Sequence, residues 1–258
     1  MTAPVSGVRL IAWQPDLQRP RDVAMSSVAS ASLYVCRAVR MSSRQPATAA
    51  FREKLMSDTT CHMSISLDGF VAGPEQSRDN PLGKRGQELH GWHIGDPRAT
   101  EADKTANSWL MRPRGAYVMG RNMFGPIRGE WNETWDGWWG PEPPYHAPVF
   151  VLTRYAHAPI EMEGGTTFHF VTEGFDAAYA QALEAADGRG VDIAGGASTV
   201  RQALNAGVID ELTLDIAPVL LSSGERIFDG VETFDFEPIE VLHSPLTTHI
   251  RYRKRDAG

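Results

Sequence analysis

Hydrophobic and polar positions alternate regularly in several segments after residue 63, and these segments predict β-strands. Residues 63–72 begin with such alternation and contain Asp68-Gly69, a dipeptide typical of turns, so they predict a strand that runs into a turn. Residues 211–217 alternate over their whole length. Shorter apolar runs are typical of buried strands, and they lie at residues 116–119, 149–152 and 191–194.

Three other segments predict helices. Residues 99–111 have Glu101 and Asp103 in the first turn, where carboxylates offset the positive end of the helix dipole. Residues 175–186 repeat their apolar side chains at helical spacing. Residues 197–206 directly follow a strand and two glycines, and a further glycine ends the predicted helix.

The alternation of strands and helices predicts one α/β domain, which we place at residues 61–256. Strand–helix–strand connections give a mostly parallel sheet flanked by helices. Residues 238–253 predict two antiparallel C-terminal strands around a Ser-Pro turn. Residues 73–98 and 125–148 form long connections rich in Gly, Pro or Trp, and connections of that length are often functional loops.

Residues 1–60 show neither strand nor helix periodicity, and we expect a disordered extension outside the domain. Residues 1–55 carry a net charge of +5 and the rest of the chain −12, which together give −7. We favour a start codon assigned too far upstream, with Met41, Met56 or Met63 as the true start. An organelle transit peptide is an alternative, because such peptides are rich in Arg and Ser and poor in acids.

The composition argues against several classes of function. A net charge of −7 disfavours a nucleic-acid binder, which needs a basic face, and no apolar run has the length of a membrane span. Cys36 and Cys61 form no CxxC pair and no disulfide framework, which fits a reducing cytoplasm. No metal site is expected, and we interpret His90 and His93 as ordinary surface histidines.

One strand, two glycines and the start of a helix form a candidate phosphate site. Glycine lets a phosphate approach the backbone, and the free N–H groups and dipole of a helix N-terminus bind negative charge. The candidate residues are Gly195, Gly196, Ala197, Ser198 and Thr199. The segment matches neither the GxGxxG nor the P-loop pattern, and the alternative is a tight packing turn between strand and helix.

Two more predicted strands end in residues that suit phosphate groups. Gly120-Arg121 follows one strand and Thr153-Arg154 follows another. Ligands of open α/β sheets bind at the carboxyl ends of the strands, and arginine can bind a 2′-phosphate with two hydrogen bonds. We therefore predict NADPH as the cofactor. The alternative is that both arginines are solvated loop residues.

The order of five segments resembles the dihydrofolate reductase superfamily. They read MSISLDGF, YVMGRNMF, VFVLTR, VDIAGGASTV and DELTLDIAPVLLSSGERIF. Within the superfamily, the chain is most similar to the branch that includes the C-terminal reductase domain of the riboflavin-biosynthesis deaminase/reductase. This resemblance implies a dihydrofolate-reductase-like sheet, an NADPH cofactor and a homodimer. It also implies that Ser66, Asp68 and Gly69 face the nicotinamide and the substrate.

Two departures from the family narrow the function. The zinc deaminase domain of the riboflavin enzyme carries HxE and PCxxC motifs, and this chain has neither, which excludes the bifunctional enzyme. True dihydrofolate reductases bind the pterin with one acid on the helix after the first strand. Asp103 or Glu101 lies near that position, but helix capping explains these acids equally well, so folate is not the expected substrate.

Trp138 and Trp139 lie in the second long connection, and their wide rings suit a flat heterocycle. We predict that they cover a substrate pocket, and the alternative is packing on the sheet or in a dimer contact.

The sequence thus predicts a reductase that transfers hydride from NADPH to a small heterocyclic or carbonyl substrate. Asp68 is the first candidate to orient the substrate or relay a proton, and Asp103 is the second. Two alternatives remain open: a nucleotide-binding module of the same fold without turnover, and a flavin-dependent protein that uses the same phosphate sites.

Overall fold

The computed structural model describes residues 58–255, and the predictions for residues 1–57 lie outside them. The strands are β1 (Thr59–Ser66), β2 (Phe70–Ala72), β3 (Ala116–Gly120), β4 (Pro148–Leu152), β5 (Ile160–Glu161), β6 (Thr167–Val171), β7 (Val191–Gly195), β8 (Glu211–Ala217), β9 (Glu225–Arg226), β10 (Phe236–His243) and β11 (Thr248–Lys254). The helices are η1 (Gly86–His90), α2 (Glu101–Leu110), α3 (Arg121–Phe124), η2 (Glu163–Gly165), α4 (Phe175–Ala186) and α5 (Ala197–Asn205).

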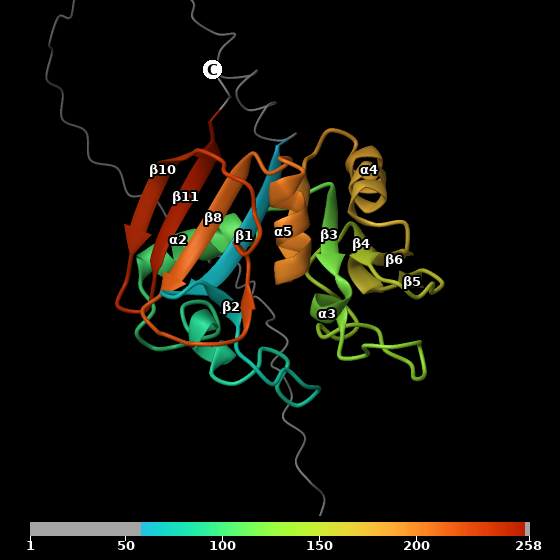
Figure 1. Cartoon of the computed structure of the whole chain (residues 1–258), viewed down its shortest axis with the longest axis horizontal. Helices are drawn as coiled ribbons and strands as arrows, with labels where there is room; N and C mark the ends of the chain where they lie inside the picture. Colours follow the sequence, from blue (N-terminus) through green and yellow to red (C-terminus); the bar gives the residue numbers. More distant parts are fainter. Residues whose placement is uncertain (1–57, 256–258) are drawn as a thin grey trace, which may run out of the picture.

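One sheet organises the domain, with its strands in the order β10-β11-β8-β1-β7-β3-β4-β6-β5 (Figure 1). Six consecutive strands of this order run parallel to one another: β8, β1, β7, β3, β4 and β6. The edge strands β11 and β10 on one side and β5 on the other are antiparallel. A short ribbon pairs β2 with β9. The predicted fold class, a mostly parallel sheet with antiparallel C-terminal strands, is confirmed.

The helices cover both faces of the sheet. Helices α4 and α5 lie in front of β3, β4 and β7, while α2 lies behind β8 and β11 (Figure 1). The larger core cluster fills the space under α4 and α5, where Ala178, Ala182 and Val200 pack on Val118 and Ile193. Each of these side chains is fully buried. Residues 175–186 and 211–217 form their elements at the predicted positions.

Strand β1 begins at Thr59, four residues before the strand predicted from residue 63. It lies between β7 and β8 and has both faces covered, so the residues before Met63 show no alternation that periodicity could detect. Strand β1 is therefore an interior strand of the sheet rather than a half-exposed one. The strand ends at Ser66 and is followed by a turn at Gly69, whose φ is +88°.

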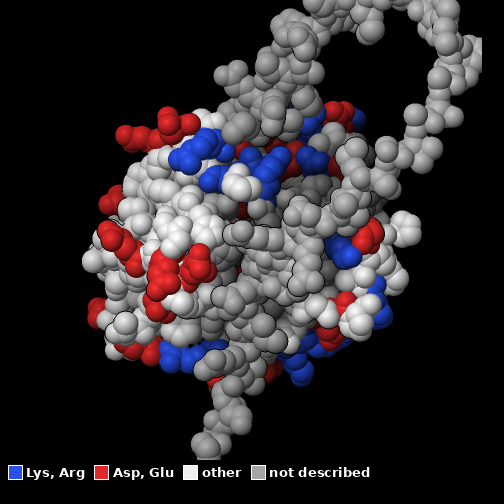
Figure 2. Space-filling model, turned by 180° about the vertical axis from the view of Figure 1, so that it is seen from behind, with Lys and Arg blue, Asp and Glu red and all other residues white. Residues whose placement is uncertain are grey.

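Two surface properties bear on the expected partners. Among residues 58–255, no helix is long and apolar enough to cross a bilayer. On the face seen in Figure 2, the described basic side chains form small groups beside acidic ones rather than one continuous basic surface.

Candidate cofactor and substrate site

The strand ends that carry the predicted cofactor residues lie side by side. Strands β7, β3 and β4 are neighbours and run parallel, so their carboxyl ends share one edge of the sheet. Contact between two of them is tight: a Cβ atom on Gly120 would lie 2.7 Å from Oγ1 of Thr199. A side chain at residue 120 would therefore separate the end of β3 from the first turn of α5.

The N-terminus of α5 has free amide groups. Its N-cap, Gly196, has no side chain to cap the helix, and the amides of Thr199 and Val200 already donate to the Gly196 carbonyl at 3.0 and 3.1 Å. The amides of Ala197 and Ser198 have no backbone acceptor in the described part of the chain. Ser198 is exposed, whereas Thr199 is buried. An anion at this end would meet two amides and the Ser198 hydroxyl.

Arg121 is a buried arginine with two guanidinium nitrogens, Nε and Nη2, that have no hydrogen-bond partner in the described part of the chain. Its Cζ lies 3.8 Å from the centre of the Trp131 ring and 5.2 Å from that of Tyr155, and Nη1 donates to Thr153 Oγ1 at 3.3 Å. Nε and Nη2 are buried without a hydrogen-bond partner among residues 58–255. Burial lowers the pKa of Arg121, Tyr155 opposes this, and Arg128 lowers it further. A bound anion would satisfy both free donors.

Arg154 differs from Arg121. Its side chain is exposed and makes no hydrogen bond or ion pair within the described residues. Of the two predicted arginines, only Arg121 is held in place by the fold.

Asp68 joins the turn after β1 to the loop after β8. Its Oδ1 accepts hydrogen bonds from Ser66 Oγ at 2.6 Å and from the Leu221 amide at 3.1 Å, and Oδ2 accepts one from the Ser222 amide at 2.7 Å. The Ser66 hydrogen bond, followed by those of the two amides, lowers the pKa of Asp68 to about 2. The carboxylate is thus ionised and occupied, which favours its structural role over the predicted proton relay.

The turn also brings Arg226 to the predicted substrate residues. A Cβ on Gly69 would lie 3.4 Å from Arg226 Nη2, and the Arg226 Cζ lies 5.1 Å from the centre of the Phe70 ring. Ser66 is buried, and its hydroxyl also accepts the Phe70 amide at 2.9 Å. Ser66 therefore shapes the turn, while Gly69 leaves room for a cationic neighbour.

Asp103 is buried and belongs to a capping box rather than to an open pocket. Its Oδ2 accepts from the Thr100 amide at 2.6 Å, and its Oδ1 accepts from Ser244 Oγ at 2.7 Å. Burial raises the pKa of Asp103, but the hydrogen bonds from Thr100, Ser244 and His249 outweigh it and lower the pKa. The side chain is 1% exposed, which favours the capping alternative, and the contact of Asp103 with substrate remains a prediction.

Behind Asp103, imidazoles and carboxylates form a buried chain that periodicity does not predict. His249 lies 3.3 Å from Asp103 Oδ1 through Nε2 and 2.7 Å from Asp215 Oδ1 through Nδ1. The other Asp215 oxygen is 2.6 Å from His62 Nε2. His62 stacks on Trp92, with ring centres 6.0 Å apart. This chain joins α2, β11, β8 and β1.

His90 and His93 are not the ordinary surface residues that the sequence predicts. His90 Nδ1 and His93 Nε2 are 3.1 Å apart, and the His93 ring centre lies 4.5 Å from that of Trp92. Burial lowers the pKa of His90 to about 4 and that of His93 to about 3. Both are therefore neutral imidazoles at neutral pH. The residues that the structure describes contain no cluster of His, Cys, Asp and Glu suited to a metal ion.

The tryptophan segment packs mainly on the sheet. Trp139 stacks on Phe168 with ring centres 6.0 Å apart and meets Tyr145 edge to face at 5.1 Å. Trp138 touches Trp135, with ring centres 4.7 Å apart, and is half-buried. The packing alternative therefore describes Trp139, while the lid prediction remains for Trp138.

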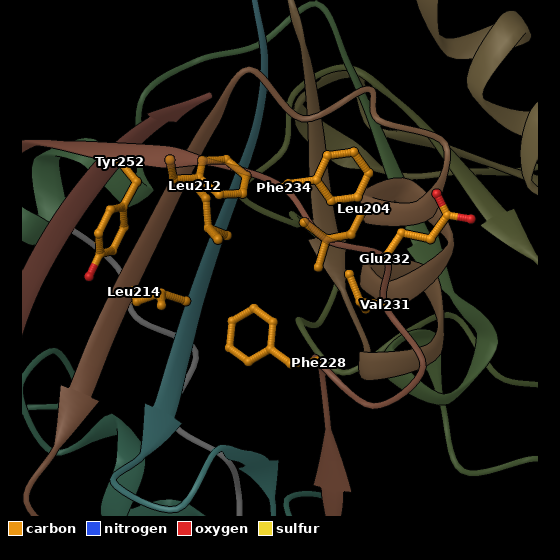
Figure 3. A pocket seen from close by; sticks show the side chains of 9 residues that line it. Leu204, Leu212, Leu214, Phe228, Val231, Glu232, Phe234 and Tyr252 are labelled. Carbon is orange, nitrogen blue, oxygen red and sulfur yellow. The ribbon is translucent and has the colours of Figure 1, made fainter. Parts of the chain in front are cut away.

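An apolar pocket of about 210 Å³ lies elsewhere, on β8, β10, β11 and the end of α5. Figure 3 shows the rings of Phe228, Phe234 and Tyr252 around it. Among residues 58–255, the one charged side chain that lines it is Glu232, an acid, so this pocket does not suit a phosphate group.

Comparison with known proteins identifies the family. The family model of the RibD C-terminal domain matches residues 59–244, well over half the chain. The chain belongs to the RibD C-terminal domain family. A search of curated proteins gave no match. Membership supports a reductase-like role and agrees with the resemblance seen in the sequence.

Three solved structures are similar to this chain. A protein of Shewanella sp. PV-4 described as a riboflavin biosynthesis protein matches with a TM-score of 0.54 and 23% identity, over 77% of this chain and 99% of that one. A pyrimidine reductase-like protein from Corynebacterium diphtheriae matches with a TM-score of 0.48 and 17% identity, over 80% and 95%. The third is the diaminohydroxyphosphoribosylaminopyrimidine deaminase/5-amino-6-(5-phosphoribosylamino)uracil reductase of Thermotoga maritima. It matches with a TM-score of 0.49 and 14% identity, over 80% of this chain and 59% of that one. The first of these shows the shared fold.

Proposed function

We propose that this member of the RibD C-terminal domain family is an NADPH-dependent reductase of a small heterocyclic or carbonyl substrate. The observation that carries the proposal is Arg121, a buried guanidinium whose Nε and Nη2 have no partner within residues 58–255. A 2′-phosphate accepts two hydrogen bonds from such a group, and NADH lacks that phosphate. The residues present therefore fit NADPH.

The two phosphate-binding regions would hold different phosphate groups of the cofactor. The free amides at the start of α5, which follows β7, suit the pyrophosphate. Arg121 follows the neighbouring strand β3, and together with Thr153 it suits the 2′-phosphate. When bound, NADPH supplies the hydride. Gly69 and Arg226 would border the substrate, and a cation there favours a substrate with a negatively charged or electron-rich group.

Hydride transfer from NADPH labelled with deuterium at C4 tests this function. The full chain is incubated with labelled NADPH and a panel of cyclic ketones and aminopyrimidines, and products are examined by mass spectrometry. Deuterium in a product supports a reductase. NADPH binding without label transfer to any compound favours the binding module, and a yellow purified protein with flavin absorbance favours the flavin alternative.

Trp138 gives a test of the lid. Trp138→Ala should raise KM for the compound that the protein reduces while NADPH binding is unchanged, because the rings that contact Arg121 are those of Trp131 and Tyr155, whereas Trp138 contacts Trp135. Unchanged KM and kcat would contradict the lid prediction.

The expected homodimer remains a prediction, and sedimentation of the purified chain would test it.

A further inference from the structure

The His90–His93 pair has one arrangement of protons that the surroundings favour. If His93 Nε2 donated to His90 Nδ1, the remaining proton of neutral His90 would lie on Nε2, which is buried and has no partner in the described part of the chain. An unpaired buried N–H is rarer and costlier than an unpaired acceptor. His90 Nδ1 therefore donates to His93 Nε2, and His90 Nε2 is the unpaired acceptor.

This arrangement places the proton of His93 on Nδ1. That nitrogen makes no hydrogen bond to a described residue, and His93 is half-buried. A neutral imidazole has one N–H, so His93 presents a single donor directed away from His90. The other titratable groups near His93 are Asp215 on β8 and His62 on β1, which bond to each other.

The pair lies at the edge of the sheet where the cofactor residues gather. Leu89 of η1 packs on Phe70, Ala217 and Leu221, so η1 sits at the carboxyl ends of β1 and β8. Trp92 donates to Ser64 Oγ at 3.0 Å, two residues before the end of β1. Strand β1 is also the neighbour of β7, which ends in Gly195-Gly196, and adjacent strands are about 5 Å apart.

We propose that His93 is a catalytic residue, a neutral imidazole whose Nδ1–H donates a hydrogen bond to the substrate oxygen or nitrogen that gains negative charge when the adjacent carbon accepts hydride. This assignment rests on the proposed reductase function. Such a donor stabilises the developing charge without first having to be protonated, and solvent water supplies the proton that completes the reduction. Asp68 and Asp103 are both occupied and leave this role open.

Two substitutions separate the donor from the His90 contact. In His93→Asn the amide nitrogen replaces Nδ1, so the donor is retained and the His90 contact is lost. In His93→Gln the amide lies near the position of Nε2, so the His90 contact is retained and the Nδ1 donor is lost. Loss of one donor to a developing oxyanion lowers kcat by about 100-fold. We expect that loss in His93→Gln and a loss of less than about 10-fold in His93→Asn.

Nitrogen-15 NMR of the full chain tests the proton position without any substrate. Long-range ¹H–¹⁵N spectra of histidine-labelled protein should show His93 protonated on Nδ1 near neutral pH, with the signal assigned by its absence in His93→Gln. A proton on Nε2 would overturn the proposal. Equal turnover of His93→Asn and His93→Gln on a compound that the wild type reduces would overturn it as well.

NADPH binding distinguishes failure of this inference from failure of the proposed function. His93 contacts His90 and Trp92, whereas Arg121 contacts Thr153, Trp131 and Tyr155, so both variants should bind NADPH like the wild type. A wild type that binds no NADPH contradicts the reductase itself. A wild type that binds and reduces, with His93→Gln fully active, contradicts only the role of His93.

Discussion

Asp215→Asn removes one charge from the buried chain of imidazoles and carboxylates while it keeps the size of the side chain. Asp215 is fully buried and accepts from His62 Nε2 at 2.6 Å and from His249 Nδ1 at 2.7 Å. An Asn side chain has one acceptor oxygen, so it can serve only one of the two imidazoles. The N–H group of the other imidazole then loses its acceptor inside the fold.

The expected cost follows from these contacts. Hydrogen bonds to a charged group contribute about 1.5–3 kcal/mol each, and because Asn retains one of the two, we expect a loss of about 2–3 kcal/mol. Urea unfolding followed by tryptophan fluorescence measures it, with an unchanged m-value as the sign of two-state behaviour. Asp79→Asn, at an exposed carboxylate, is the matched control and should change stability by less than about 0.5 kcal/mol.

The loss should also depend on pH. Burial raises the pKa of Asp215, but His62 and His249 outweigh it and lower the pKa in the folded protein. Its contribution is therefore present above the unfolded value of 3.8 and disappears as pH falls through the folded value. A loss below about 1 kcal/mol near neutral pH, or one that grows as the solution becomes more acidic, would refute this reasoning.

Three further predictions concern other contacts. The pKa of Asp68 falls from 3.8 to about 2 on folding, so wild-type stability should decrease as pH falls from about 4 to about 2, and Asp68→Asn should lack that step in acid titrations followed by circular dichroism. Gly120→Ala should destabilise the domain by about 1–3 kcal/mol in urea because its Cβ would meet Thr199 Oγ1 at 2.7 Å, and Thr199→Ala should restore most of the loss. Trp139→Ala should cost about 2 kcal/mol in thermal unfolding, because the ring packs on Phe168 but remains half-buried; no loss would contradict the packing role.

Local patterns in the sequence were sufficient for most of the fold. The helix at 175–186 and the strand at 211–217 were predictable because each has one buried face, which gives a clear period. The start of β1 at Thr59 was not, because a central strand is covered on both faces. The helix η1 lies inside a connection that the sequence predicts only as a loop.

The candidate site was predictable where it follows strand ends and unpredictable where distant residues meet. Gly120, Arg121 and the Gly195-Gly196 turn come together because parallel strands end at one edge. His62 and Asp215, by contrast, are separated by 153 residues, and no spacing rule connects them. His93 is half-buried rather than a surface residue, because its neighbour Trp92 packs on His62 and His249 from other strands.

Trp131 and Arg226 were also missed. Trp131 belongs to the tryptophan segment that the sequence singled out, but only the structure shows its ring 3.8 Å from the Arg121 guanidinium. Arg226 reaches Gly69 through the short pairing of β2 with β9, and strands of two or three residues leave no periodic signal.

Calorimetric titration of the full chain with NADPH and with NADH tests the central claim most directly, with Arg121→Ala as the variant and Arg154→Ala as the control. Hydrogen bonds to charged groups contribute about 1.5–3 kcal/mol, which corresponds to about 10- to 100-fold in affinity. We expect wild type to bind NADPH more tightly than NADH by about that factor, Arg121→Ala to remove the preference, and Arg154→Ala to keep it. Equal affinity of the wild type for both cofactors, or a preference that survives in Arg121→Ala, would contradict that claim.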